Sequence, residues 1–236
     1  MINLFLEKIK DEGIELNERQ ISRFETYKKL VLEWNKKFNI TSITDSDEFD
    51  LKHLYDCALL FKLDEIKNAK SIIDIGTGGG FPGIPLKILI EDADFLLIDG
   101  SGKRIRFLEH VIDELELKDI KAIHERAEIM ARDVKYRDKF DIAVSRAVAP
   151  LNTLCEYCMP LVKESGEFIA MKGSSAASEL KEAKNAINIL NGSLKDKIDY
   201  TLEESDHNRS LILIKKEGKT PKKYPRAGGA PKNKPL

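Results

Sequence analysis

A run of glycines between residues 74 and 83, DIGTGGGFPG, is the segment best suited to bind a ligand. Glycine adopts positive φ angles readily and lets a ligand approach the backbone closely. The run follows a short apolar segment that we predict to be a buried strand, and it leads into a predicted helix whose first turn suits Pro82. Nucleotides bind at the carboxyl ends of the strands in open α/β sheets, so we expect such a ligand at Gly76, Gly78 and Gly80. A tight turn is the structural alternative, but it rarely needs so many glycines.

Polar residues at the ends of the following strands are candidates for the same site. Asp99 ends the second strand, and its carboxylate suits the hydroxyl groups of a ribose. After the third strand, the backbone of Ala127 is expected to bond an adenine ring, and Glu128 to accept from its exocyclic amine. Arg146 follows the fourth strand and can hold a carboxylate or a phosphate in a bidentate manner, and Lys172 ends the fifth at the same rim. Two structural alternatives stay open, a helix N-terminal carboxylate for Glu128 and an ion pair for Arg146.

The elements that position these residues alternate between strands and helices. Short apolar segments are typical of strands and the stretches between them of helices, which predicts βαβ units and a parallel sheet. Two last strands without a long helix between them predict an antiparallel closing pair, and apolar steps of three and four predict helices near the N-terminus. Expected strands are 71–75, 95–99, 120–123, 140–145, 166–171, 198–202 and 211–215; expected helices are 17–38, 48–61, 82–90, 103–115, 127–132, 151–161 and 175–190.

The chain is therefore expected to be an α/β protein with a doubly wound, mostly parallel sheet. We divide it into an N-terminal helical extension (1–65), a ligand-binding domain (66–220) and a basic C-terminal tail (221–236). The segment 215–236 holds eight Lys or Arg and one Glu, so it carries +7 and the remainder −8. Such an end is usually solvated, but it also suits a polyanion.

Composition excludes several classes of protein. A content of 42% hydrophobic and 33% charged residues is that of a globular domain. No apolar run approaches the roughly 20 residues of a membrane-spanning helix, and no signal peptide is recognisable, so we expect a cytoplasmic monomer without membrane contact. Cys155 and Cys158 form a C-x-x-C without a second ligand pair, which indicates core packing and no metal site.

The glycine spacing alone leaves the cofactor open. Gly78, Gly80 and Gly83 satisfy G-x-G-x-x-G, so a nicotinamide cofactor has to be considered. The D-x-G-x-G-x-G form that begins at Asp74 resembles motif I of the class I methyltransferases, as does the antiparallel closing strand. The sequence shows no Tyr-x-x-x-Lys signature of a dehydrogenase. S-adenosyl-L-methionine is therefore the expected cofactor.

Several motifs together resemble the bacterial small-subunit ribosomal RNA methyltransferase G family, also called glucose-inhibited division protein B. Their order and spacing match over most of the chain, although Cys57, Gly100-Ser101 and Asn233 depart from the family pattern. The matching motifs are Trp34-Asn35 with Asn39-Ile40-Thr41, His53 with Asp56, the glycine run from Asp74 to Leu86, Lys103-Arg104, Arg126-Ala127-Glu128, Ser145-Arg146-Ala147 and Tyr224-Pro225-Arg226.

The resemblance implies methyl transfer to N7 of a guanine in 16S ribosomal RNA, with RNA or a small-subunit particle as partner. It implies cofactor contacts at Gly76, Phe81, Ala127, Glu128 and Arg146, and we expect Arg104, Lys172 and Arg226 to contact RNA. Guanine N7 has no proton to lose, so no catalytic base is expected. The alternatives are a nicotinamide-dependent oxidoreductase and a non-catalytic RNA-binding protein with this fold.

Overall fold

A seven-stranded sheet forms the centre of the computed structural model, which describes residues 1–202 and 208–236. The strand order is β3-β2-β1-β4-β5-β7-β6. Neighbouring strands are parallel except around β7, which runs antiparallel to β5 and to β6. The strands are β1 (Ser71–Ile75), β2 (Asp94–Asp99), β3 (Ile120–His124), β4 (Phe140–Arg146), β5 (Val162–Lys172), β6 (Gly192–Tyr200) and β7 (Arg209–Lys216).

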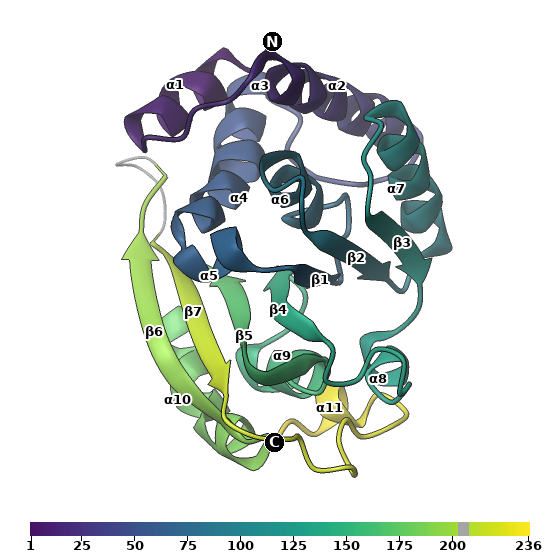
Figure 1. The fold of residues 1–236 in the computed structure, drawn as a ribbon, viewed down its shortest axis with the longest axis vertical. Coiled ribbons are helices and arrows are strands. Elements are labelled where there is room, and N and C mark those ends of the chain that lie inside the picture. Colours follow the sequence, from purple (N-terminus) through teal and green to yellow (C-terminus); the bar gives the residue numbers. More distant parts are fainter. Residues whose placement is uncertain (203–207) are drawn as a thin grey trace.

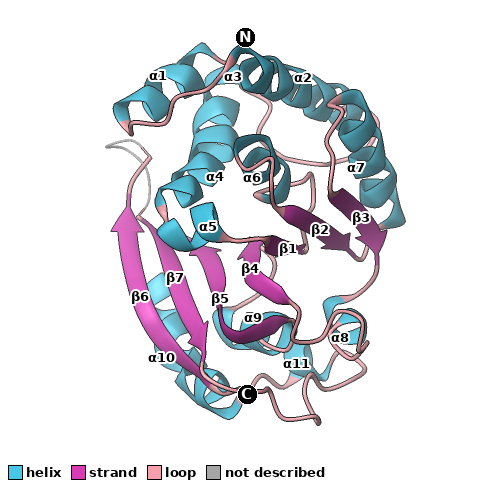
Figure 2. Cartoon of the chain, viewed as in Figure 1, coloured by secondary structure: helices cyan, strands magenta, loops and turns pink. Residues whose placement is uncertain are grey.

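Helices cover both faces of this sheet (Figures 1 and 2). Successive strand residues point to opposite faces, so Ile72 packs into the core under the first helical layer and Ile73 into the core under the second. The first layer holds α1 (Asn3–Asp11), α2 (Glu18–Asn35), α3 (Ser46–Phe49), a π-helical turn η1 (Asp50–Tyr55), α4 (Asp56–Ala58), a 3-10 turn η2 (Leu59–Lys62), α5 (Asp64–Asn68), α6 (Gly83–Leu89) and α7 (Gly102–Glu114). The second holds α8 (Ala127–Met130), α9 (Leu151–Cys158), α10 (Ala176–Ile189) and α11 (Ala230–Asn233).

The predicted alternation of strands and helices is confirmed. The predicted bounds of two strands differ from those in the structure. The strand at 71–75 has its predicted bounds. Strand β5 begins four residues earlier than predicted, at Val162, and β6 covers Gly192–Tyr200 and not 198–202. Their first residues, VKES and GSLKDK, are largely polar, and β6 pairs with β7 alone at the edge of the sheet. An edge strand does not need apolar residues on both faces, so the hydrophobic pattern missed its first half.

The N-terminal helices are fastened to the sheet domain by buried polar contacts. Asn17 caps α2 in a reciprocal capping box with Gln20. The guanidinium of Arg23 donates to the carbonyls of Leu115 and Glu116 at the end of α7. Further along α2, the Tyr27 hydroxyl donates to the carbonyl of Gly79 at 2.7 Å. The helical layer thus lies directly on the glycine loop.

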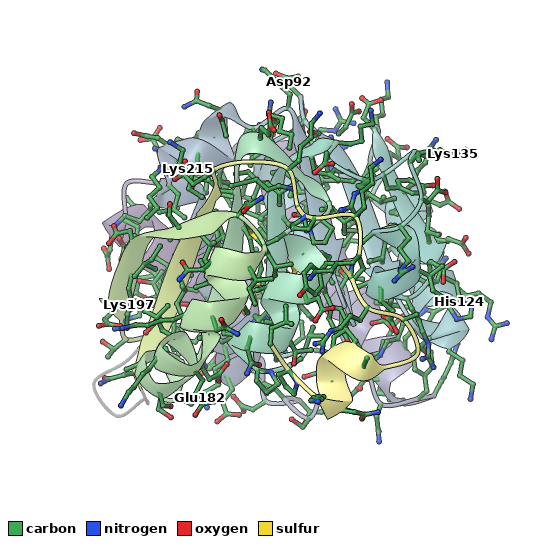
Figure 3. The ribbon with its side chains drawn as sticks, turned by 90° about the horizontal axis from the view of Figure 1, so that it is seen from below. Asp92, His124, Lys135, Glu182, Lys197 and Lys215 are labelled. Atoms are coloured by element: carbon green, nitrogen blue, oxygen red, sulfur yellow. The ribbon has the colours of Figure 1, made fainter. Side chains whose placement is uncertain are left out.

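The C-terminal tail packs along the second helical layer, and Figure 3 shows it in yellow, crossing the near side of the green helices. Arg137 donates to the carbonyls of Thr220 and Tyr224, and the Thr153 hydroxyl donates to the carbonyl of Pro231. Gly228 and Gly229 both have positive φ and lead into α11, which has a proline in its first turn. The Pro and Gly residues that suggest a loose end in the sequence therefore form a turn and a short helix.

Candidate active site

The glycine loop after β1 faces two different surroundings. Gly76, Gly78 and Gly80 all have positive φ, at 69°, 61° and 100°. A Cβ at Gly80 would lie 2.6 Å from Ile84 and 3.0 Å from the Tyr27 hydroxyl, so that glycine lets α2 and α6 pack closely. Gly76 instead lines a cavity at the carboxyl edge of the sheet. Gly76 therefore lines the cavity and Gly80 allows the helices to pack closely; a ligand contact at Gly76, Gly78 or Gly80 stays a prediction.

Asp74 braces this loop from below. Its Oδ2 accepts from the Thr77 hydroxyl at 2.7 Å and from the Gly83 N–H at 2.9 Å, and its side chain is fully buried. Burial raises the pKa of Asp74 to about 6. Asp74 thus holds residues three and nine positions further along the loop, which explains why an aspartate precedes the glycines.

The cavity beside Gly76, here called cavity A, has a volume of about 160 Å³ and lies at the ends of β1, β2 and β3. It brings together four predicted cofactor residues, Gly76, Asp99, Ala127 and Glu128. Asp99 Oδ2 accepts from the Gly78 N–H at 3.0 Å and from Arg104 at 3.2 Å. Glu128 lies in the first turn of α8, with 9% of its surface exposed. Its carboxylate is therefore both near the N-terminus of a helix and in the wall of cavity A.

A second hollow, cavity B, has a volume of about 530 Å³ and lies beyond the ends of β4 and β5. Its wall contains the buried carboxylate of Asp56, which accepts from Tyr200 at 2.8 Å and from Arg146 and Arg209 at 3.1 Å each. Burial and the neighbouring Asp56 charge raise the pKa of Tyr200 strongly. These contacts join η1–α4, β4, β6 and β7 at one carboxylate.

Arg146 connects this cluster to His53. Its guanidinium, which can only donate, lies 2.9 Å from Nδ1 of His53. Nδ1 therefore accepts, and Nε2 carries the proton and donates to the Thr41 hydroxyl at 2.7 Å. Burial, aided by the Arg146 charge, lowers the pKa of His53 to about 3. The neutral ring stacks on Phe81 with centroids 4.4 Å apart, so Phe81 lies against the helical layer and is not among the residues lining cavity A.

The motifs singled out in the sequence acquire concrete roles through these contacts. Asn35, at the end of α2, accepts from the N–H groups of Ile40 and Thr41. This holds Thr41 against His53, so the WN…NIT and H-x-x-D motifs meet. Arg146 forms an ion pair with Asp56, which was the structural alternative left open by the sequence, and it also lines cavity B. Its contact with the cofactor stays a prediction.

The three residues expected at RNA are all engaged within the chain. Arg104 pairs with Asp99 and is 40% exposed at its side chain. Lys172 is nearly buried and donates to the Ala149 carbonyl at 2.6 Å. Arg226 forms a bidentate pair with the fully buried Glu156. Their RNA contacts stay predictions. Of these three cationic side chains, that of Arg104 is the most exposed.

The residues at the cavities that the sequence expectations did not name include Val148, Tyr200 and Arg209. Tyr200 and Arg209 lie at the facing ends of β6 and β7, on either side of the undescribed residues. The available signal for Arg209 was an arginine at the start of a strand, two residues before the apolar run 211–214. Cys155 and Cys158 are fully buried, which raises the pKa of both thiols and agrees with core packing.

Comparisons with known proteins point in one direction. A family model described as rRNA small subunit methyltransferase G matches residues 20–209. A curated protein of Clostridium botulinum, named ribosomal RNA small subunit methyltransferase G, is 47% identical over 234 residues, 99% of this chain and 98% of the relative.

Solved structures with little sequence similarity share the fold. The ribosomal protein L11 methylase of Lactobacillus delbrueckii superposes with a TM-score of 0.54 at 18% identity, covering 71% of this chain and 80% of that one. The structure of M. jannaschii TYW2 in complex with AdoMet superposes with a TM-score of 0.52 at 13% identity, covering 68% of this chain and 76% of that one.

No helix in residues 1–202 and 208–236 is long and apolar enough to span a membrane.

Proposed function

Since the chain belongs to the rRNA small subunit methyltransferase G family, we propose that it transfers the methyl group of S-adenosylmethionine to N7 of a guanine in 16S ribosomal RNA. The observation that carries this proposal is the pair of adjoining cavities at the carboxyl edge of the sheet. One is lined by the residues expected to hold the cofactor, and the other is large enough for a nucleobase.

Cavity A fits the adenosyl part of the cofactor. Gly76 presents backbone without a Cβ, Ile75 and Ile98 give apolar walls for a base, and Asp99 and Glu128 supply carboxylates for ribose hydroxyls and an exocyclic amine. Gly78 contributes its N–H to Asp99 and so positions that carboxylate. Bound there, the cofactor supplies an activated methyl group.

Cavity B is the proposed place of the target guanine, and its residues do not need to move a proton. N7 carries a free lone pair at neutral pH. Both ring nitrogens of His53 are engaged, and Asp56 is held by Arg146, Arg209 and Tyr200. The chain therefore contributes alignment of the two reactants and exclusion of water. In A-form RNA the major groove is too deep and narrow for side chains to enter, so the guanine belongs to an irregular or single-stranded region.

Arg104 and Arg226, with Lys172 in the wall of cavity B, are proposed to face RNA phosphates around the site. The substrate also implies that the enzyme acts in the cytoplasm. We further propose a monomer, which sedimentation of the purified chain would test. A nicotinamide-dependent oxidoreductase and a non-catalytic RNA-binding protein are the alternatives to exclude.

The test combines binding and turnover. Calorimetry is expected to detect S-adenosylmethionine and not NAD, and Glu128→Gln should weaken cofactor affinity by about tenfold, because it replaces an ionised acceptor. Labelled methyl transfer to 16S RNA and to small-subunit particles from cells lacking the enzyme then identifies the substrate form. Binding of NAD alone, or cofactor binding without transfer to either substrate, would contradict the proposal.

A further inference from the structure

Val148 stands between the two cavities. It follows β4, lines both cavity A and cavity B, and leaves 40% of its surface exposed. The family motif at this point covers Ser145, Arg146 and Ala147 and stops one residue short of it. An apolar side chain exposed at the junction of two polar-rimmed cavities calls for an explanation.

The Val148 side chain fills the space where a side chain of residue 76 would lie. A Cβ at Gly76 would lie 2.4 Å from Cγ2 of Val148 and 3.1 Å from Cγ1. Such distances leave no space for any ligand atom between the two residues. Gly76 therefore lacks a side chain on the face where Val148 now packs.

The size of cavity A leads to the same conclusion. Its volume of about 160 Å³ is below the roughly 300 Å³ at which sites for small molecules and cofactors begin. Cavity B has about 530 Å³ but contains none of the residues expected at the adenosyl group. A molecule as long as S-adenosylmethionine fits only if the two volumes join, and Val148 occupies the junction.

The backbone around Val148 is held at both ends and strained between them. Arg146 is paired with Asp56 on one side, and on the other Lys172 holds the Ala149 carbonyl while Glu179 accepts from the Leu151 N–H. Ala147 has φ of 57°, a left-handed conformation that is unfavourable for a residue with a Cβ. Strain of this kind persists where the surroundings impose it, and it gathers at sites that switch.

We propose that Val148 is a gate of the cofactor site: its side chain covers Gly76 in the free protein and leaves it when the methionine end of S-adenosylmethionine enters. This inference rests on the proposed cofactor site at cavity A. Only the fraction of molecules with Val148 displaced binds, so the apparent affinity is reduced by that fraction. Removing the side chain removes the competition for Gly76.

Val148→Ala tests the gate directly through binding kinetics, without any measurement of turnover. Stopped-flow with S-adenosylmethionine should show an association rate about fivefold higher, an unchanged dissociation rate and a Kd about fivefold lower. Val134→Ala is the matched control, because that valine is 80% exposed and lies away from both cavities. It should bind as the wild type does.

Wild-type association kinetics in Val148→Ala would overturn the gate, and so would weaker binding through faster dissociation, which identifies Val148 as a contact of the bound cofactor. Glu128→Gln separates these outcomes from a failure of the site itself. If it weakens binding while Val148→Ala changes nothing, cavity A holds the cofactor and only the gate is wrong. If Glu128→Gln binds like the wild type, the cofactor lies elsewhere and both proposals fail.

Discussion

At the scale of single residues, the most informative group is a histidine that stays neutral in the folded chain at neutral pH, because burial and the Arg146 charge lower its pKa to about 3. Nδ1 of His53 accepts from Arg146 and Nε2 donates to Thr41, so these contacts fix which ring nitrogen carries the proton. A second proton would have to displace the Arg146 contact and sit beside a cation. His53 is therefore a neutral connector between the segment after α2, the π-helical turn and β4.

This neutrality predicts a pH-dependent contribution to stability. Because the pKa of His53 is lowered to about 3 from an ordinary 6.5, its contribution is fully present above pH 6.5 and is lost as pH falls from there towards 3. The difference in free energy of unfolding between the wild type and His53→Asn should shrink by roughly 2 kcal/mol between pH 7 and about 4.5. Urea denaturation at both pH values measures it, with exposed His124→Asn as control; an unchanged difference would contradict the assignment.

The same reasoning gives a prediction for the chemical step. N7 has no proton to lose, His53 is neutral and Asp56 accepts from three donors, so the reaction needs no base from this cluster. Single-turnover methylation at saturating RNA should therefore vary little from about pH 6.5 to 8.5. Rapid-quench measurements across this range check it, and a bell-shaped profile would reveal a base or acid that the cluster does not contain.

At the scale of elements, the Asp56 cluster joins the helical layer to the ends of three strands. Arg146→Ala leaves a buried carboxylate with two of its three donors, so we expect a loss of about 3 kcal/mol in unfolding free energy. A double-mutant cycle with Asp56→Ala should give a coupling of about 2 kcal/mol. The exposed pair Lys29–Glu33, 3.9 Å apart, is the control and should show less than about 0.5 kcal/mol. Equal coupling in both pairs would mean that burial adds nothing.

Element types were predictable from sequence because each central strand is apolar on both faces. Ile72 and Ile73 pack into different cores, and such a strand gives a continuous hydrophobic run. The edge strand β6 gave no such run. For the site, residues within four positions of a strand end could be placed near the sheet edge from sequence, and Gly76, Ala127 and Glu128 all line cavity A. Contacts between distant segments, such as Tyr200 with Asp56 over 144 positions, leave no local pattern.

At the scale of the whole molecule, the tail combines a folding role with an exposed charge. Arg226 holds the buried Glu156, whereas Lys222, Lys223, Lys232 and Lys234 are exposed. Deleting the tail would therefore confuse stability with RNA affinity. Substituting only the exposed lysines separates them.

The four substitutions Lys→Gln should weaken RNA binding without lowering Tm. If about three of these lysines contact phosphate, the slope of log affinity against log salt becomes shallower by about 2, while cofactor affinity is unchanged. Filter binding of single-stranded 16S RNA fragments over a salt series measures the slope. Arg226→Ala is the contrasting control, which should lower Tm because Glu156 loses its partner. An unaltered slope in the lysine variant would show that the tail only packs on the domain.

The position of β7 has a consequence for how the chain acquires its shape during synthesis. β7 comes last in sequence but lies between β5 and β6, and β6 has no other neighbour. While the ribosome is still producing residues 209–216, β6 has no strand to pair with and β5 has one open edge. Domains assemble from the N-terminus as they emerge, yet this sheet closes only when its final strand inserts. A truncated messenger would yield a chain with an exposed sheet edge prone to aggregation.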